Sequence, residues 1–218
     1  MNGIGKSTLL RTLGNFQPKL NGSIALEGIS IEKLNQTTLA KKISVVLTEP
    51  MASKNMKVKE LLALGRQPYT NWLGKLSEAD IAAIHKSVEL LELEPFMKKQ
   101  CSELSDGQLQ RVMIARALVQ DTDIILLDEP TTHLDLYHKV QILKILKSIV
   151  EETQKAILFT SHEIELAIQL CDKMLLLDGG QNSFDEPCKL IENKKFDSLF
   201  PSDTLFFDGS TGSFRIKK

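Results

Sequence analysis

Hydrophobic positions along the chain alternate between short continuous runs and stretches with helical spacing. Five runs predict strands, at 22–27, 43–47, 124–127, 156–160 and 174–178. The last three are continuous apolar runs, which is typical of strands buried on both faces of a sheet. Helical spacing covers 6–13 and returns between the runs. This alternation predicts an α/β fold with a mostly parallel sheet covered by helices.

From 57 to about 118 the pattern is helical, which predicts a helical subdomain inserted into one domain that spans 1–218. Ser77 and Asp80 have the spacing of a capping box ahead of an apolar periodic stretch, so a helix should begin there. Near the end, the segments 204–207 and 214–217 flank a turn with Asp208-Gly209 and predict a small antiparallel hairpin.

Composition excludes several classes of protein. The net charge of -1 over 218 residues argues against a large nucleic-acid footprint, which needs a clustered basic surplus. Cys101, Cys171 and Cys188 lack C-x-x-C spacing and predict reduced thiols rather than disulfides or a zinc site. No apolar run approaches the roughly 20 residues that cross a bilayer. If a membrane is involved, we expect another polypeptide to span it.

The first residues carry the second half of a phosphate-binding loop, G-x-x-x-x-G-K-[ST], as Gly5-Lys6-Ser7. In such a loop backbone N–H groups surround the phosphates, the lysine reaches the β and γ phosphates, and the following hydroxyl ligates Mg²⁺. The helix after it directs its positive end toward the anion. Because the first glycine and the strand that feeds the loop would precede Met1, we expect an N-terminally shortened version of a longer protein.

Two acids, Asp128-Glu129, follow four apolar residues at the carboxyl end of a predicted central strand, where ligands of open α/β sheets bind. In P-loop enzymes the first such acid holds Mg²⁺ and its neighbour orients the attacking water. Two solvated acids at a strand end are the alternative. With Gly5-Lys6-Ser7 in the same chain, the catalytic interpretation is favoured.

Leu104-Ser105-Asp106-Gly107-Gln108 resembles the signature of the nucleotide-binding subunits of ATP-binding cassette (ABC) transporters, and the resemblance covers essentially the whole chain. It implies a P-loop NTPase that binds ATP and Mg²⁺. It also implies a homodimer, in which the signature caps the ATP of the opposite subunit. On this resemblance the expected ATP-binding residues are Asn2, Gly3, Gly5, Lys6, Ser7 and Thr8, with Ser105, Gly107 and Gln108 acting across the dimer.

Locally, Ser105 and Gly107 are expected to offer a hydroxyl and an exposed N–H at a helix start. Asp106 replaces the glycine most often seen in the signature, and we expect it to face away and stabilise the helix N-terminus.

Further residues match the family by position. Leu134-Asp135 resembles the D-loop, which implies an interface role for Asp135. His162 matches the switch histidine, which makes it a catalytic candidate beside Glu129, although a histidine after a strand is otherwise a core or capping residue. Glu49 stands where the family has a glutamine; it could ligate Mg²⁺ but cannot donate an amide hydrogen bond. The remaining histidines, His85, His133 and His138, are expected at the surface or an interface.

The segments 64–74 and 76–80 are similar to the subdomain entry of ATPases that serve iron-siderophore, haem and vitamin B12 importers. Ordinary packing, with Tyr69 and Trp72 as core aromatics, is the alternative. The resemblance implies transmembrane permease partners, an indirect link to a periplasmic or surface substrate-binding protein, and a peripheral place on the cytoplasmic face of the bacterial inner membrane. Two other functions stay open: a soluble non-transport ABC ATPase, and a truncated cassette with little activity.

Overall fold

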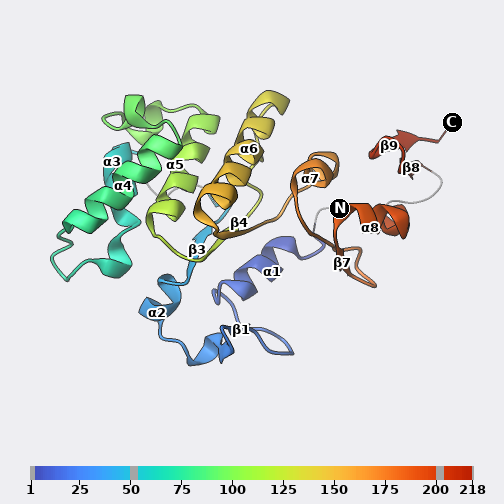
Figure 1. Cartoon of the computed structure of the whole chain (residues 1–218), viewed down its shortest axis with the longest axis horizontal. Helices are drawn as coiled ribbons and strands as arrows, with labels where there is room; N and C mark the ends of the chain where they lie inside the picture. Colours follow the sequence, from blue (N-terminus) through green and yellow to red (C-terminus); the bar gives the residue numbers. More distant parts are fainter. Residues whose placement is uncertain (1–2, 50–53, 200–203, 218) are drawn as a thin grey trace. The chain divides into compact units, whose positions relative to one another are not determined.

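The computed structural model describes residues 3–49, 54–199 and 204–217 (Figure 1). The chain divides into two compact units. The larger unit comprises Leu10–Thr160, and the smaller comprises Met1–Leu9 with Ser161–Lys218. Across these described ranges, no helix is both long and apolar enough to cross a membrane.

The larger unit contains a parallel sheet of three strands, β3 (Ile43–Val46), β4 (Ile124–Leu127) and β5 (Ala156–Phe159), in the order β3-β4-β5. The predicted fold class and these three predicted strands are confirmed. β4 lies in the middle and is buried from Ile125 onward, as expected for a central strand. β5 is only half-buried, so its predicted burial on both faces is wrong. It forms an edge of this sheet, and Leu158 is 43% exposed.

The α-helices of the larger unit are α2 (Gln36–Ala40), α3 (Val58–Leu64), α4 (Glu78–Leu90), α5 (Asp106–Val119) and α6 (Leu136–Thr153), together with the end of α1 (Lys6–Leu13), which begins in the smaller unit. Figure 1 shows α3, α4 and α5 packed together, within the range predicted as an inserted subdomain. The capping box at the start of α4 is confirmed, because Ser77 Oγ accepts from Asp80 N and Asp80 accepts from Ser77 N. The separate subdomain about 57–118 stays a prediction.

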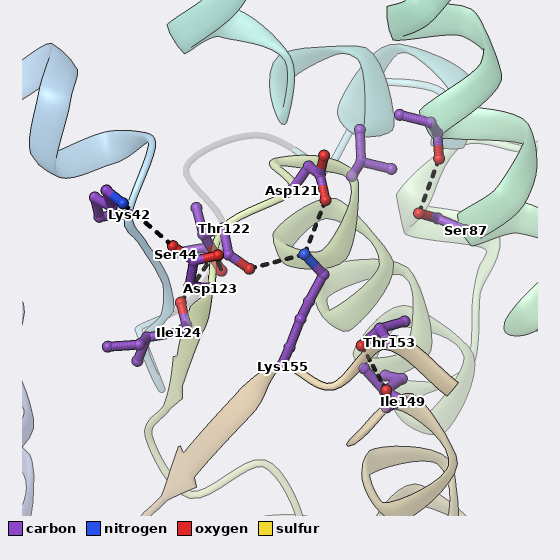
Figure 2. A network of polar contacts seen from close by, with 12 residues as sticks. Lys42, Ser44, Ser87, Asp121, Thr122, Asp123, Ile124, Ile149, Thr153 and Lys155 are labelled. Carbon is purple, nitrogen blue, oxygen red and sulfur yellow. Dashed lines mark hydrogen bonds and ion pairs between the residues drawn. The ribbon is translucent and has the colours of Figure 1, made fainter. Parts of the chain in front are cut away.

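Polar contacts join the ends at which the three parallel strands begin (Figure 2). Thr122 Oγ1 donates to the hydroxyl of the fully buried Ser44 at 3.0 Å, which links the start of β4 to β3. Lys155, just before β5, donates to Asp121 Oδ1 at 2.8 Å and to the Thr122 carbonyl at 2.9 Å. These contacts fix the amino ends of the strands and therefore the positions of the opposite ends, where the predicted chemistry lies.

Two predicted strands pair differently from expectation. The strand predicted at 22–27 is reduced to β1 (Ala25–Leu26), which pairs antiparallel with β2 (Ile29–Ser30). The chain reverses there because Glu27 and Gly28 both adopt positive φ, at 50° and 78°. In the smaller unit, β6 (Met174–Leu176) pairs antiparallel with β7 (Ser183–Asp185). The expectation that 174–178 forms a strand of the parallel sheet is therefore wrong.

The smaller unit has its own apolar cluster around Phe196, which is nearly inaccessible to solvent. The ring of Phe196 stacks on Phe207, with centroids 4.7 Å apart, and Phe214 meets Phe207 edge-on. The unit also contains α7 (Ile164–Leu170), α8 (Pro187–Glu192), and the strands β8 (Leu205–Asp208) and β9 (Ser213–Ile216). β8 and β9 pair antiparallel, which confirms the predicted terminal hairpin.

Candidate functional site

In the smaller unit, the predicted phosphate loop runs into the start of α1. Gly3 and Gly5 adopt φ of 79° and 100°, with no heavy atom within 4 Å of the position where a Cβ would stand. Leu9 N donates to the Gly5 carbonyl at 2.8 Å, so the helix begins directly after the second glycine. Left-handed glycines ahead of a helix start form a concave run of backbone N–H groups that suits a phosphate. Asn2, also predicted at this site, lies outside the described residues.

Lys6 and His162 are brought together in the same unit, although 156 positions separate them in the chain. Lys6 Nζ lies 3.1 Å from Nε2 and 3.3 Å from Nδ1 of the imidazole. The turn before α7 holds the histidine, because Ser161 Oγ accepts from Glu163 N at 2.9 Å. An ammonium and an imidazole at this separation can both donate to one anionic group. Two residues predicted to contact the γ-phosphate are therefore neighbours.

The carboxylates lie in the larger unit, at the carboxyl end of β4, and Thr160 binds both of their residues. Asp128 is 4% exposed, and its Oδ1 accepts from Thr160 Oγ1 at 2.7 Å. The same hydroxyl accepts from Glu129 N at 2.9 Å. Thr160 was not predicted from the sequence. It follows β5 as Asp128 follows β4, and the carboxyl ends of neighbouring parallel strands lie side by side, so its position could have indicated this contact. The hydroxyl holds Asp128 and Glu129 in one fixed arrangement.

Glu129 has a strained backbone, with φ of 47°, a conformation that non-glycine residues seldom adopt. Its Oε2 accepts from Thr132 Oγ1 at 3.0 Å, and Thr132 N donates to the Glu129 carbonyl at 3.1 Å. The chain therefore turns sharply at this residue, and the carboxylate is held at the turn. Such strain is often found at functional positions.

The segment after β3 sends two side chains in different directions. Thr48 Oγ1 donates to the carbonyl of Asp128 at 3.1 Å, so the threonine reaches the end of β4. The carboxylate of Glu49 pairs with the guanidinium of Arg11 on α1, and both side chains are substantially exposed. An exposed ion pair of this kind is weak, so Glu49 could leave Arg11 for another cation. Ligation of Mg²⁺ by Glu49 stays a prediction. Thr48 is the second residue that sequence reasoning passed over.

The signature segment opens α5 with a reciprocal cap. Ser105 Oγ accepts from Gln108 N at 3.3 Å, and Gln108 Oε1 accepts from Ser105 N at 3.1 Å. Asp106 is exposed at the first position of the helix, where a carboxylate is favourable. Gly107 is buried as a residue, and the ring of His138 lies 3.1 Å from the position of its absent Cβ; the expected exposure of its N–H group stays a prediction.

Asp135 caps α6 by accepting from His138 N at 2.9 Å. The imidazole Nδ1 lies 2.8 and 2.9 Å from the two carboxylate oxygens. These bonds, the backbone one first, lower the pKa of Asp135. His85, His133 and His138 are exposed, as predicted. In the ranges that the structure describes, no three His, Cys, Asp or Glu side chains gather as metal ligands, and all three cysteines are free.

The loop between α3 and α4 presents aromatic side chains outward. Trp72 is 92% exposed, so its interpretation as a core aromatic is wrong, and Tyr69 is partly exposed. The base of the loop is fixed by the buried pair between Arg66 Nε and Asp80 Oδ1, at 2.7 Å. The guanidinium also donates to the Val119 carbonyl at 2.8 Å and lies 4.0 Å from the ring centroid of Tyr69.

Comparison with known proteins gives consistent matches. A family model described as ABC transporter matches residues 1–132. The petrobactin import ATP-binding protein FpuC of Bacillus anthracis is 33% identical over 218 residues, which cover 100% of this chain and 80% of FpuC. The achromobactin transport ATP-binding protein CbrD of Dickeya dadantii (strain 3937) is 33% identical over 204 residues, 93% of this chain and 76% of CbrD.

Among solved structures, a dimeric post-hydrolysis state of the ATP-binding cassette MJ0796, bound to ADP and Pi, matches with a TM-score of 0.70 and 28% identity. The match covers 84% of this chain and 82% of that one. With the family model, it confirms the predicted P-loop NTPase fold, nucleotide binding and ATPase activity. The chain belongs to the ABC transporter family, as an ATP-binding and ATP-hydrolysing subunit.

Proposed function

We propose that this chain powers the import of an iron chelate, such as an iron-siderophore or haem, or of vitamin B12. The relatives FpuC and CbrD are named for petrobactin import and achromobactin transport, and they match nearly the whole chain. The exposed loop that carries Trp72 is the segment whose sequence is similar to this importer class. The observation that carries the catalytic part is the fixed pair Asp128 and Glu129 at the end of β4.

Nucleotide binding is assigned to the phosphate loop and its helix. Gly3 and Gly5 have the left-handed backbone and the open space at the Cβ position that suit a phosphate loop, and Lys6 supplies the positive charge for the β and γ phosphates. Asn2 and Thr8 are also assigned to ATP. His162 donates to the γ-phosphate, an assignment supported by its contact with Lys6.

Mg²⁺ is assigned to oxygen ligands, the hydroxyl of Ser7 and the carboxylate of Asp128, with Glu49 as a weaker candidate. These donors fit the ion, because Mg²⁺ takes hard oxygen ligands and usually binds through one or two protein groups plus phosphates. The buried carboxylate of Asp128, already oriented by Thr160, is suited to this task. When bound, the ion neutralises charge on the phosphates.

Hydrolysis is assigned to Glu129 as the general base. Its carboxylate accepts a proton as the water oxygen bonds to the γ-phosphorus, and the bond from that phosphorus to the β,γ-bridging oxygen breaks to release ADP. Thr132 orients the carboxylate through the hydrogen bond to Oε2. Holding the base in place reduces the reorganisation needed in the transition state.

The working assembly is proposed as a homodimer bound to permease subunits at the cytoplasmic face of the bacterial inner membrane, with a substrate-binding protein acting indirectly. Ser105, Gly107 and Gln108 are assigned to the nucleotide of the second copy, and Asp135 to the interface. The match to a dimeric cassette supports this arrangement. Nucleic acid is not among the proposed partners. The whole of 1–218 is assigned to one ATPase domain, with a helical subdomain at about 57–118.

The test is ATP hydrolysis by the purified chain with Glu129→Gln, beside Glu151→Gln as a control, because Glu151 is an exposed acid of α6. We expect the Glu129 variant to bind ATP but to lose turnover by at least about 100-fold, since general-base catalysis contributes that much. The control should match the wild type. Normal hydrolysis by Glu129→Gln would remove the assignment of the base.

The cargo needs a separate test. The gene should restore uptake of a labelled iron-siderophore to a bacterium that has the matching permease but lacks its ATPase, and Glu129→Gln should not. If uptake of vitamin B12 is restored and that of the iron-siderophore is not, the cargo is vitamin B12 rather than an iron chelate.

A further inference from the structure

His138 binds the Asp135 carboxylate at the start of α6 through both its backbone and its side chain. Its backbone N–H donates to Oδ1 at 2.9 Å, and its Nδ1 lies 2.8 Å from Oδ1 and 2.9 Å from Oδ2. An N-cap needs only the backbone bond. The contact between the imidazole Nδ1 and both carboxylate oxygens is an additional interaction, and it fixes the rotation of the carboxylate about the Cβ–Cγ bond.

The same ring covers the signature glycine. Its Cδ2 lies 3.1 Å from the place where a Cβ on Gly107 would stand, a separation closer than ordinary van der Waals contact. The turn that contains Gly107 is stiff in itself, because Ser105 and Gln108 cap each other. The ring of His138 therefore binds Asp135, the residue before α6, and lies over Gly107 in the first turn of α5.

The neighbouring side chains leave this bridge accessible to a partner. Leu136 and Tyr137 are both about two-thirds exposed, at 68% and 67%, and Tyr137 packs edge-on to the His138 ring with centroids 5.4 Å apart. Apolar side chains exposed beside a charged pair are common at protein interfaces.

We propose that His138 is a positioning residue, which locks Asp135 to the Ser105–Gln108 turn so that both segments meet a second copy with one fixed relative geometry. The inference rests on the proposed dimer. If the starts of α5 and α6 moved independently, each would lose conformational entropy separately when the second copy binds. If the ring of His138 already joins them, less entropy is lost on binding. The joined pair therefore favours the closed dimer that hydrolyses ATP.

The test compares His138→Ala, Asp135→Asn and the double variant by ATPase kinetics. Asparagine caps a helix as well as aspartate does, so Asp135→Asn keeps the cap of α6 and removes the charged partner of the ring. We expect each single variant to lower kcat by about three- to tenfold, with the KM for ATP changed by less than about twofold. The double variant should be no worse than the more severe single variant. His85→Ala, an exposed histidine of α4, is the matched control.

A stability cycle tests the contact itself. Gly107→Ala should lower the thermal unfolding midpoint in the wild-type background and have little effect in His138→Ala, because the smaller side chain leaves room for the added methyl group. An equal cost in both backgrounds would overturn the bridge.

The remaining outcomes separate the two proposals. If the wild type hydrolyses ATP and His138→Ala does so equally well, the positioning role is overturned and the proposed function stands. If the effects of His138→Ala and Asp135→Asn multiply, the two residues act independently and the positioning role is likewise overturned. A wild-type chain without ATP turnover would overturn the proposed function, and the inference that rests on it.

Discussion

Replacing Asp80 with alanine removes the acid that anchors the loop between α3 and α4. Its Oδ1 binds Arg66 Nε at 2.7 Å, and its Oδ2 accepts from the backbone N–H and the hydroxyl of Ser77, at 2.8 and 2.6 Å. The side chains of Arg66 and Asp80 are only 8% and 4% exposed. Alanine would leave a buried guanidinium with the Val119 carbonyl and the Tyr69 ring as remaining partners.

Removing one partner of a buried ion pair costs about 3–5 kcal/mol of folding stability. Because Arg66 keeps two other contacts, we expect Asp80→Ala to lie at the lower end, about 3 kcal/mol. Asp80→Asn keeps one acceptor oxygen, for either Arg66 or Ser77, and turns an NH2 donor toward the other, so it should still be destabilising but by less than alanine.

The pH dependence gives an independent measure of the same contacts. Hydrogen bonds from Ser77, followed by the one from Arg66, lower the pKa of Asp80 from 3.8 to about 2. A shift of that size corresponds to about 2–3 kcal/mol at most, and to less where solvent screens the charge. Since the folded pKa lies below the unfolded one, this stability is present above about pH 4 and is lost as the pH falls through about 2.

The measurement is urea unfolding followed by far-UV circular dichroism, with hydrogen exchange of the α4 amides to report the larger unit separately. Glu89→Ala, an exposed acid of the same helix, is the control and should stay within about 0.5 kcal/mol of the wild type. The reasoning is refuted if Asp80→Ala is as stable as Glu89→Ala, or more stable than Asp80→Asn.

Three further predictions concern other parts of the chain. Thr160→Val should lower ATP turnover and cost about 1–2 kcal/mol of folding stability, because Asp128 and Glu129 lose a shared hydroxyl. Thr160→Ser keeps the hydroxyl and should therefore keep both the turnover and the stability of the wild type. Equal effects of the two variants would contradict this. Burial raises the pKa of Cys171 to about 11. A thiol reagent at pH 8 should therefore label the exposed Cys188 first, and labelling of Cys171 should rise only as the pH approaches about 11. Mass spectrometry that finds Cys171 labelled first would exclude this order. Phe196→Ala should destabilise the smaller unit by about 3–5 kcal/mol and speed amide exchange in β8 and β9, and unchanged exchange there would count against an apolar core centred on this ring.

The sequence predicted those helices and strands that are determined by residues close together in the chain. Apolar runs, continuous for β4 and β5, located β3, β4 and β5, and serine with an acid three positions later located the start of α4. The pairing of β6 was predicted wrongly, because a short apolar run looks the same whether its neighbour lies parallel or antiparallel.

The candidate site shows the same limit. Motifs located Lys6, Asp128 and Glu129, since their chemistry requires those residue types at that spacing. Thr160 and Thr48 escaped, because they act through hydrogen bonds to residues 32 and 80 positions away in the chain. No local pattern distinguishes such a threonine from any other residue at a strand end. The role of the ring of His138 above Gly107 likewise depends on where two helix starts meet.

The far end of α5 is fastened to the backbone of β3 and of the last residue of α2. Gln120 Nε2 donates to the carbonyls of Ala40 and Ile43, at 2.6 and 3.2 Å, and Arg116 Nη2 donates to that of Val45 at 3.1 Å. The helix has 14 residues and is therefore about 21 Å long. With its C-terminal end as the fulcrum, a tilt of about 10° would carry the Ser105 end through about 4 Å. A small rotation of this helix about that end would therefore be amplified at the signature turn.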